Sequence, residues 1–238
     1  MKLFLFIYYA LAFLATPFAA AKKKVNVQWA ICDSSPQEVL RKLGMGTPDP
    51  YKQNPITYYD TEPPTYISNG IMFRKKTSKG QKISTVKVRF HEKPSEVPDW
   101  AECVWDRYGE NATFTCEKRC PLPEDGSSIW CNEQIKLAER YQCINWTELT
   151  AFGPYDNAKW KIRIEGHKAK FDDVAAGPLH LMEVEAKVPP KKEQKAYEAI
   201  TRHLTSRGVV LCDRQEGKTQ RLFRALGYRV DVDERDEL

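Results

Sequence analysis

Apolar and polar residues alternate along several stretches of this chain, at the period of two that places successive side chains on opposite faces of a strand. The alternation predicts strands at 25–32, 56–60, 71–76, 83–90, 160–165 and 179–188. In the last of these, Met182, Val184, Ala186 and Val188 share one face, while Glu183, Glu185 and Lys187 share the other. Two carboxylates and an amine are therefore expected on one side of one strand.

Three segments carry helix signals. Ser35-Pro36-Gln37-Glu38 combines an N-cap serine, a proline in the first turn and a capping-box glutamate, which predicts a short helix ending at Gly44. Apolar stripes at 191–206 and 218–226 predict two further helices. The mixture of separate strands and a few helices indicates an α+β fold.

The charged strand faces have two interpretations. One is an antiparallel sheet with one face in water, which requires no special function. The other is a strongly curved sheet or barrel whose charged faces converge inward while helices cover the apolar outside. Arginine and lysine in such a cavity would bind a polyanion, and carboxylates could hold a divalent metal against its phosphates.

The two ends of the chain suggest the secretory pathway. A basic start, an apolar run from Leu3 to Leu14 and small residues at 19–21 predict a signal peptide at 1–21, cleaved near Ala21. No later stretch is apolar enough for a transmembrane segment of the mature chain. The acidic tail at 231–238 ends in Arg235-Asp236-Glu237-Leu238, which is similar to signals bound by the retrieval receptor of the endoplasmic reticulum. We expect the lumen of the endoplasmic reticulum, with secretion to the extracellular space as the alternative.

Seven cysteines and two sequons agree with that route. The sequons place glycosylation candidates at Asn111 and Asn145. The disulfide candidates are Cys32, Cys103, Cys116, Cys120, Cys131, Cys143 and Cys212. Five of them lie within 91–157, which predicts a cysteine-rich insertion of irregular hairpins, but spacing leaves the connectivity open. The odd count leaves one thiol free or paired with another chain, and the spacing gives poor support for zinc.

The net charge of +5 is modest, and lysine and arginine are spread along the chain. This distribution argues against a nucleic-acid partner bound by one basic patch and still permits a local anion site.

Three segments, in their order and spacing, carry a resemblance to a known family. They are Tyr58-Tyr59-Asp60-Thr61 followed by Gly70, then Ile71-Met72-Phe73-Arg74-Lys75-Lys76, then Ser84-Thr85-Val86-Lys87-Val88-Arg89. With the later Met182-Glu183-Val184-Glu185 and Gly217-Lys218-Thr219, this order resembles the CYTH domain of the triphosphate tunnel metalloenzyme superfamily. The resemblance implies an antiparallel eight-stranded tunnel-like β-barrel over 22–230, flanked by a few helices and interrupted by the insertion.

The resemblance also implies residue roles. The phosphate ligands would be Arg74, Lys76, Lys87, Arg89, Lys161, Arg163 and Lys218. Glu183 and Glu185 would hold Mg²⁺ or Mn²⁺, and the partner would be a phosphorylated small molecule or polyphosphate. No catalytic residue is assigned apart from this metal site.

One departure from the family pattern concerns the first strand. The family has Glu-x-Glu-x-Lys there, whereas this chain has Asn26, Gln28 and Ala30 on the corresponding face. Loss of those carboxylates should weaken metal binding, because hard divalent cations favour charged oxygen ligands. A permuted register, in which Glu183-Val184-Glu185-Ala186-Lys187 supplies the missing motif, is a further alternative.

Three functions follow from these patterns. The first is binding of a polyanion in a basic tunnel with catalysis weakened or lost. The second is an active metal-dependent triphosphatase or polyphosphatase that hydrolyses a phosphoanhydride. The third is a non-enzymatic interaction protein that acts through its cysteine-rich insertion.

Overall fold

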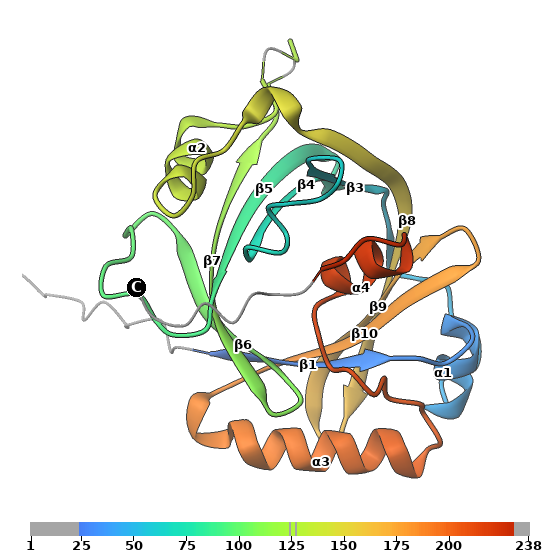
Figure 1. Cartoon of the computed structure of the whole chain (residues 1–238). Coiled ribbons are helices and arrows are strands. Elements are labelled where there is room, and N and C mark those ends of the chain that lie inside the picture. The colour runs from blue at the N-terminus through green and yellow to red at the C-terminus, as the bar shows by residue number, and fades with distance from the viewer. Residues whose placement is uncertain (1–23, 124, 127, 231–238) are drawn as a thin grey trace, which may run out of the picture.

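A computed structural model describes residues 24–123, 125–126 and 128–230 of the chain. The expected signal peptide, its cleavage position and the C-terminal retrieval signal lie outside the described residues. Figure 1 shows the described part as a β-barrel with helices around it and one short helix at its open end.

Nine of the strands close into a barrel. Their order is β8-β3-β4-β5-β7-β6-β1-β10-β9, with β9 paired back to β8, while β2 lies outside and pairs only with β8. The bounds are β1 (Val25–Ile31), β2 (Lys52–Gln53), β3 (Ile56–Asp60), β4 (Ile71–Ser78), β5 (Gln81–Phe90), β6 (Glu102–Tyr108), β7 (Asn111–Pro121), β8 (Thr150–Ile164), β9 (His167–Ala176) and β10 (Leu179–Val188). The predicted tunnel-like α+β barrel is confirmed.

Two details of the expected barrel are wrong. It has nine strands rather than eight, and it is mixed, because β1 runs parallel to β6 and antiparallel to β10. Two of the nine strands come from the segment expected to form irregular hairpins: β6 and β7 form a regular hairpin within the barrel wall. A parallel pair needs a long connection, and here the chain passes through β2 to β5 between β1 and β6.

Three of the four described helices, the first three in chain order, pack against the apolar outer face of the barrel. The helices are α1 (Pro36–Lys42), α2 (Asn132–Glu139), α3 (Glu193–Ser206) and α4 (Lys218–Ala225), with short 3₁₀ turns at Trp146–Glu148 and Pro190–Lys192. Ser35 caps α1 as predicted, since its Oγ accepts a hydrogen bond from the Glu38 amide at 3.3 Å. Trp29 of β1 and Ile200 of α3 lie in one buried cluster, and Phe73 of β4 and Leu137 of α2 lie in another.

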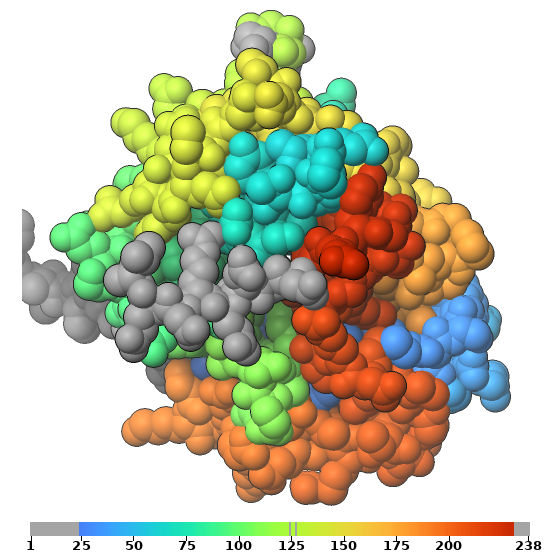
Figure 2. Space-filling view, in the orientation of Figure 1, coloured from blue at the N-terminus to red at the C-terminus, as the bar shows by residue number. Residues whose placement is uncertain are grey.

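Helix α4 lies at one end of the barrel interior (Figure 1). Leu222 and Phe223 of α4 are buried in one cluster with Tyr58, Met72 and Leu181, which come from three different strands. In the space-filling view, α4 lies beside the loop 61–70 (Figure 2), and Tyr228 after α4 donates a hydrogen bond to Glu62 at 3.0 Å. The apolar face of α4 therefore fills this end of the tunnel.

Three disulfides join Cys32 to Cys212, Cys103 to Cys116, and Cys120 to Cys131, and Cys143 is free and exposed. The second joins directly paired residues of β6 and β7, so it lies within the barrel wall. The first ties the end of β1 to the segment that leads into α4. Among the described residues, no helix is long and apolar enough to cross a membrane.

Candidate functional site

The barrel encloses a cavity of about 420 Å³. It is lined by inward-facing residues of the barrel strands and by Lys218 and Thr219 of α4. Its cationic lining residues are Lys52, Arg74, Lys76, Lys87, Arg89, Arg119, Lys159, Lys170, Lys187 and Lys218. Its acidic ones are Glu102, Asp106, Glu117, Asp172, Glu183 and Glu185. Ten basic side chains face six acidic ones, so the enclosed space favours an anion.

The cavity brings together most of the predicted site residues. Arg74, Lys76, Lys87, Arg89, Lys218, Glu183 and Glu185 all line it. Lys161 and Arg163 do not: both are exposed, and Lys161 lies over the Tyr51 ring at 4.9 Å. They occupy the predicted face of β8, but this strand extends past the cavity, and Lys159 is its cationic residue in the lining.

Arg74, Lys76 and Arg89 of β4 and β5 form what we call the basic wall. Arg74 Nη2 lies 3.8 Å from Glu117 Oε2, and Glu117 also pairs with Arg119. The Nε of Arg74 and the Nη1 of Arg89 are buried without a hydrogen-bond partner among the described residues. Buried donors on charged groups are costly when unpaired, so a ligand that accepts hydrogen bonds from these two donors would be stabilised.

Charges in and next to the basic wall shift the pKa values of Lys76 and Glu117. The positive charge of Arg74, followed by burial, lowers the pKa of Lys76 from 10.5 to about 6. Burial acts to raise the pKa of Glu117, but Lys87, Arg74 and Arg119 outweigh it and lower the pKa. Lys76 is thus a largely neutral amine at neutral pH, and an anion in the cavity would favour its charged form.

Asp172, Glu183 and Glu185 of β9 and β10 form what we call the acidic wall. Lys218 Nζ pairs with Asp172 and lies 3.2 Å from Glu183 Oε1. Lys159 Nζ bonds the other oxygen of Asp172 at 2.5 Å, and Tyr108 donates to Glu183 Oε2 at 3.0 Å. All four oxygens of Asp172 and Glu183 therefore have protein partners.

Burial governs protonation in the acidic wall. Desolvation, helped by the charge of Glu185, raises the pKa of Glu183 from 4.5 to about 7. Desolvation also lowers the pKa of Lys218, and neighbouring cations add to the effect. Without Lys218, Glu183 would be protonated more easily, and without Glu183, Lys218 would lose its proton more easily. The charged forms of these two residues therefore stabilise each other.

The first strand provides amides where the family pattern has carboxylates. Asn26 donates to Asp106 at 2.7 Å, and Gln28 accepts a hydrogen bond from Tyr108 at 2.5 Å. Asp106, only 1% exposed, also pairs with Lys87 at 2.9 Å. Gln28 and Glu183 thus compete for the single hydrogen of the Tyr108 hydroxyl, and the amides are part of a hydrogen-bonded network.

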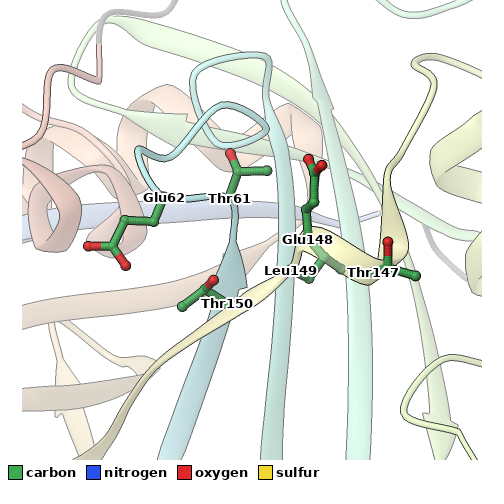
Figure 3. Close-up of a pocket in the computed structure, with 6 residues that line it drawn as sticks. All are labelled: Thr61, Glu62, Thr147, Glu148, Leu149 and Thr150. Atoms are coloured by element: carbon green, nitrogen blue, oxygen red, sulfur yellow. The ribbon is translucent and has the colours of Figure 1, made fainter.

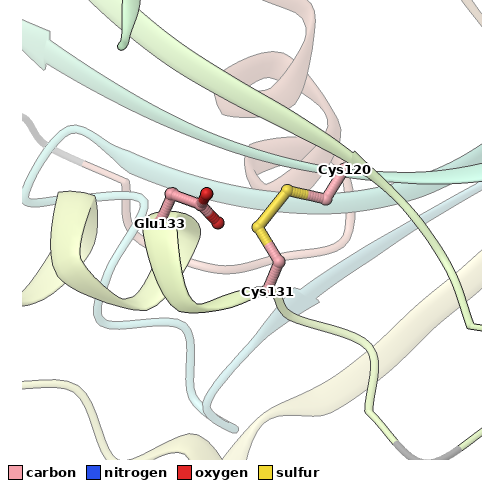
Figure 4. A group of neighbouring side chains, drawn as sticks. All are labelled: Cys120, Cys131 and Glu133. Atoms are coloured by element: carbon pink, nitrogen blue, oxygen red, sulfur yellow. A yellow bond between two sulfur atoms is a disulfide. The ribbon is translucent and has the colours of Figure 1, made fainter. Parts of the chain in front are cut away.

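These residues do not fit a divalent metal as they are arranged. Such an ion takes about six oxygen ligands, but the oxygens of Asp172 and Glu183 already bind protein donors. Among the described residues, the only group of three or more acidic, cysteine or histidine side chains within mutual ligating distance is Cys120, Cys131 and Glu133. Its two sulfurs form a disulfide (Figure 4), so they are not thiolate ligands.

Several lining residues were missed from the sequence, namely Asp106, Tyr108, Glu117 and Arg119 of β6 and β7 and Lys170 and Asp172 of β9. Their signal is the same period-two alternation, for example Thr115, Glu117 and Arg119 along β7. The cysteines on these strands directed the interpretation toward an insertion. Strand pairing, which sequence alone does not give, brings these residues into the cavity.

A second hollow lies outside the barrel, between Thr61-Glu62 and residues 147–150 (Figure 3). It measures about 350 Å³, and its charged lining groups are the carboxylates of Glu62 and Glu148, which disfavour an anion. The nearby Asn145 is exposed, as is Asn111 at the β6–β7 turn. Both remain glycosylation predictions.

Among known proteins, only solved structures are similar to this chain, and they show its fold. No family model matches the chain, and no curated protein sequence does. A Hippeastrum protein, described as an adenylyl cyclase candidate with a dominant triphosphatase activity, is similar at TM-score 0.53 and 13% identity, over 88% of this chain and 99% of that one. A Bacillus halodurans protein, described as an adenylate cyclase candidate, is similar at TM-score 0.58 and 14% identity, over 85% of this chain and 98% of that one. The chain therefore has the closed-barrel fold of the CYTH-like triphosphate tunnel proteins.

Proposed function

We propose that this chain binds a phosphorylated polyanion inside its tunnel and has weak or no hydrolytic activity. The unpaired buried donors of Arg74 and Arg89, in a cavity with an excess of cations, carry this proposal. Phosphate oxygens accept several charge-assisted hydrogen bonds at once, which matches donors fixed on adjacent strands. The triphosphatase activity described for the Hippeastrum protein agrees with a ligand of this class.

Weak hydrolysis is inferred from the acidic side of the tunnel. Metal-assisted attack on a phosphoanhydride needs a cation held by carboxylates. Here Asn26 and Gln28 replace two of them, and Asp172 and Glu183 are paired with Lys218. The alternative of an active triphosphatase would use Glu183 and Glu185, which do face the cavity.

One experiment separates these functions. Calorimetric titration with tripolyphosphate should show binding, and incubation with tripolyphosphate or nucleoside triphosphates plus magnesium or manganese should release little phosphate. Metal-dependent release that disappears in Glu183→Ala would establish the enzyme instead. Absence of both binding and release would favour the interaction protein acting through residues 91–157.

We further propose residence in the lumen of the endoplasmic reticulum. Three disulfides among the described residues suit an oxidising compartment, and the sequence predicts a signal peptide and a retrieval signal. Removal of residues 235–238 should then shift the protein from cells to the medium. Equal secretion of the full chain and the truncated chain would show that the protein is secreted without retrieval.

A further inference from the structure

Lys218 has a fixed position inside the tunnel. It begins α4, whose Arg221 donates to the carbonyl oxygens of Met182 at 2.9 Å and Ile31 at 3.0 Å. Leu222 and Phe223, on the same helix, are fully buried. The helix is thus attached to β1 and β10, and the Lys218 side chain, 14% exposed, extends from it toward β9 and β10.

The ammonium of Lys218 lies between two carboxylates that could otherwise be metal ligands. It pairs with Asp172 on β9 and with Glu183 on β10, at 3.2 Å from the latter. An ammonium group has three donors and no acceptor, so it satisfies carboxylate oxygens much as a cation would. While it is there, its positive charge opposes the binding of a divalent cation at those oxygens.

The charge of the cavity makes a metal unnecessary for binding. A divalent cation in a phosphate site neutralises the oxygens that protein side chains leave uncompensated. The lining here already has more cations than carboxylates, and the basic wall retains unpaired donors. Phosphate oxygens can therefore be neutralised entirely by arginine and lysine.

We propose that Lys218 takes the place of a divalent cation on the acidic wall, so that the tunnel binds its polyanion without metal. This inference rests on the proposed function and specifies it further: the ligand is a metal-free polyphosphate or phosphate ester. The site is built by residues of five elements, β4, β5, β9, β10 and α4.

The first test needs no variant. Tripolyphosphate is titrated into the wild-type mature chain by calorimetry, once in EDTA and once with magnesium in excess. We expect binding in EDTA that is at least as tight as with magnesium. Binding at least about tenfold tighter with magnesium would overturn the metal-free proposal alone. No binding under either condition would instead overturn the proposed function.

The second test measures metal directly, without ligand, from the electron paramagnetic resonance signal of free Mn²⁺. The wild type should leave this signal unchanged. Lys218→Met frees one oxygen each of Asp172 and Glu183 and should deplete it. Lys168→Met, at an exposed position on β9, should behave as wild type. Depletion by the wild type would contradict the proposal, and so would no depletion by a Lys218→Met protein with folded-state circular dichroism.

Discussion

The two charged walls of the tunnel differ in how their charges are satisfied. In the acidic wall, Asp172 and Glu183 have a protein partner for every oxygen. In the basic wall, Arg89 keeps a buried donor without a partner, and Lys76 is held largely neutral by its neighbour Arg74. Asp172 and Glu183 are thus satisfied in the absence of a ligand, whereas the basic wall keeps donors that a ligand could satisfy. Variants should therefore affect stability on one side and binding on the other.

The largest effect is expected from breaking the acidic wall. Lys218→Met keeps most of the side chain's length but leaves the buried Glu183 without a cationic partner, so the free energy of unfolding should fall by about 3 kcal/mol. Glu183 has a pKa of about 7, well above 4.5, so it is ionised only at higher pH. The loss should therefore increase as the pH rises through that value. Urea unfolding of both proteins at several pH values measures it.

Lys168→Met is the control for this measurement, because Lys168 is exposed on the same strand as Asp172. Its free energy of unfolding should stay within about 0.5 kcal/mol of wild type. An equal loss in both variants would show that the acidic wall is not held together by Lys218.

The next effect concerns the basic wall and should appear in binding alone. Arg89→Met removes charge-assisted hydrogen bonds and should weaken tripolyphosphate binding by about 1.5–3 kcal/mol. Stability should be equal to or above that of wild type, because a buried donor without a partner is removed. Calorimetry and urea unfolding together measure the pair of effects, and the exposed Arg163→Met is the matched control. If Arg89→Met instead lowered the free energy of unfolding and left tripolyphosphate affinity unchanged, the basic wall would contribute to stability and not to binding.

A smaller effect follows from the protonation of Lys76. Its pKa of about 6 lies far below the 10.5 of the unfolded chain. The unfolded state therefore binds more protons between these values, and the free energy of unfolding should rise with pH across that range. A bound polyanion should raise the pKa of Lys76, so binding at about pH 8 should take up a proton. Titrations in buffers of different ionisation enthalpy detect this uptake, and Lys76→Met should reduce it.

The smallest expected effect defines the extent of the site along β8. Lys159 lines the cavity and pairs with Asp172, whereas Lys161 is exposed beyond it. Lys161→Met should change tripolyphosphate affinity by less than about threefold, as is usual for an exposed charge, and Lys159→Met should change it more. A larger effect at Lys161 would move the binding site toward the end of the barrel near Tyr51.

The sequence predicted those strands that have one apolar face and one charged face. Strand β10 has the predicted bounds, and Arg74, Lys76 and Arg89 face inward as expected. The strands β6 and β7 were missed because clustered cysteines in a chain predicted to enter the secretory pathway suggest irregular, disulfide-stapled structure. In fact Cys103 and Cys116 are cross-strand neighbours in a regular ladder. Polar and apolar residues do alternate along β7, but the cluster of cysteines predicts an insertion.

The pairing of charges could not be predicted in the same way. Nothing along the chain places Lys218 against Asp172, since these residues lie 46 positions apart and meet only because α4 enters the barrel. The parallel pairing of β1 and β6, which brings Asn26 to Asp106, is likewise a property of the closed barrel. Local patterns give the face on which a side chain lies, and long-range closure gives its partner.

The position of α4 has a consequence for the length of any ligand. Because Leu222 and Phe223 fill one end of the barrel with apolar contacts, a linear polyphosphate has no path through it. Such a chain can enter only by a terminus, and phosphates beyond the mouth remain in solvent. Affinity should thus increase with the first few phosphate units and then become independent of length. A tunnel closed at one end therefore binds the terminus of a polyphosphate chain and not its internal phosphates.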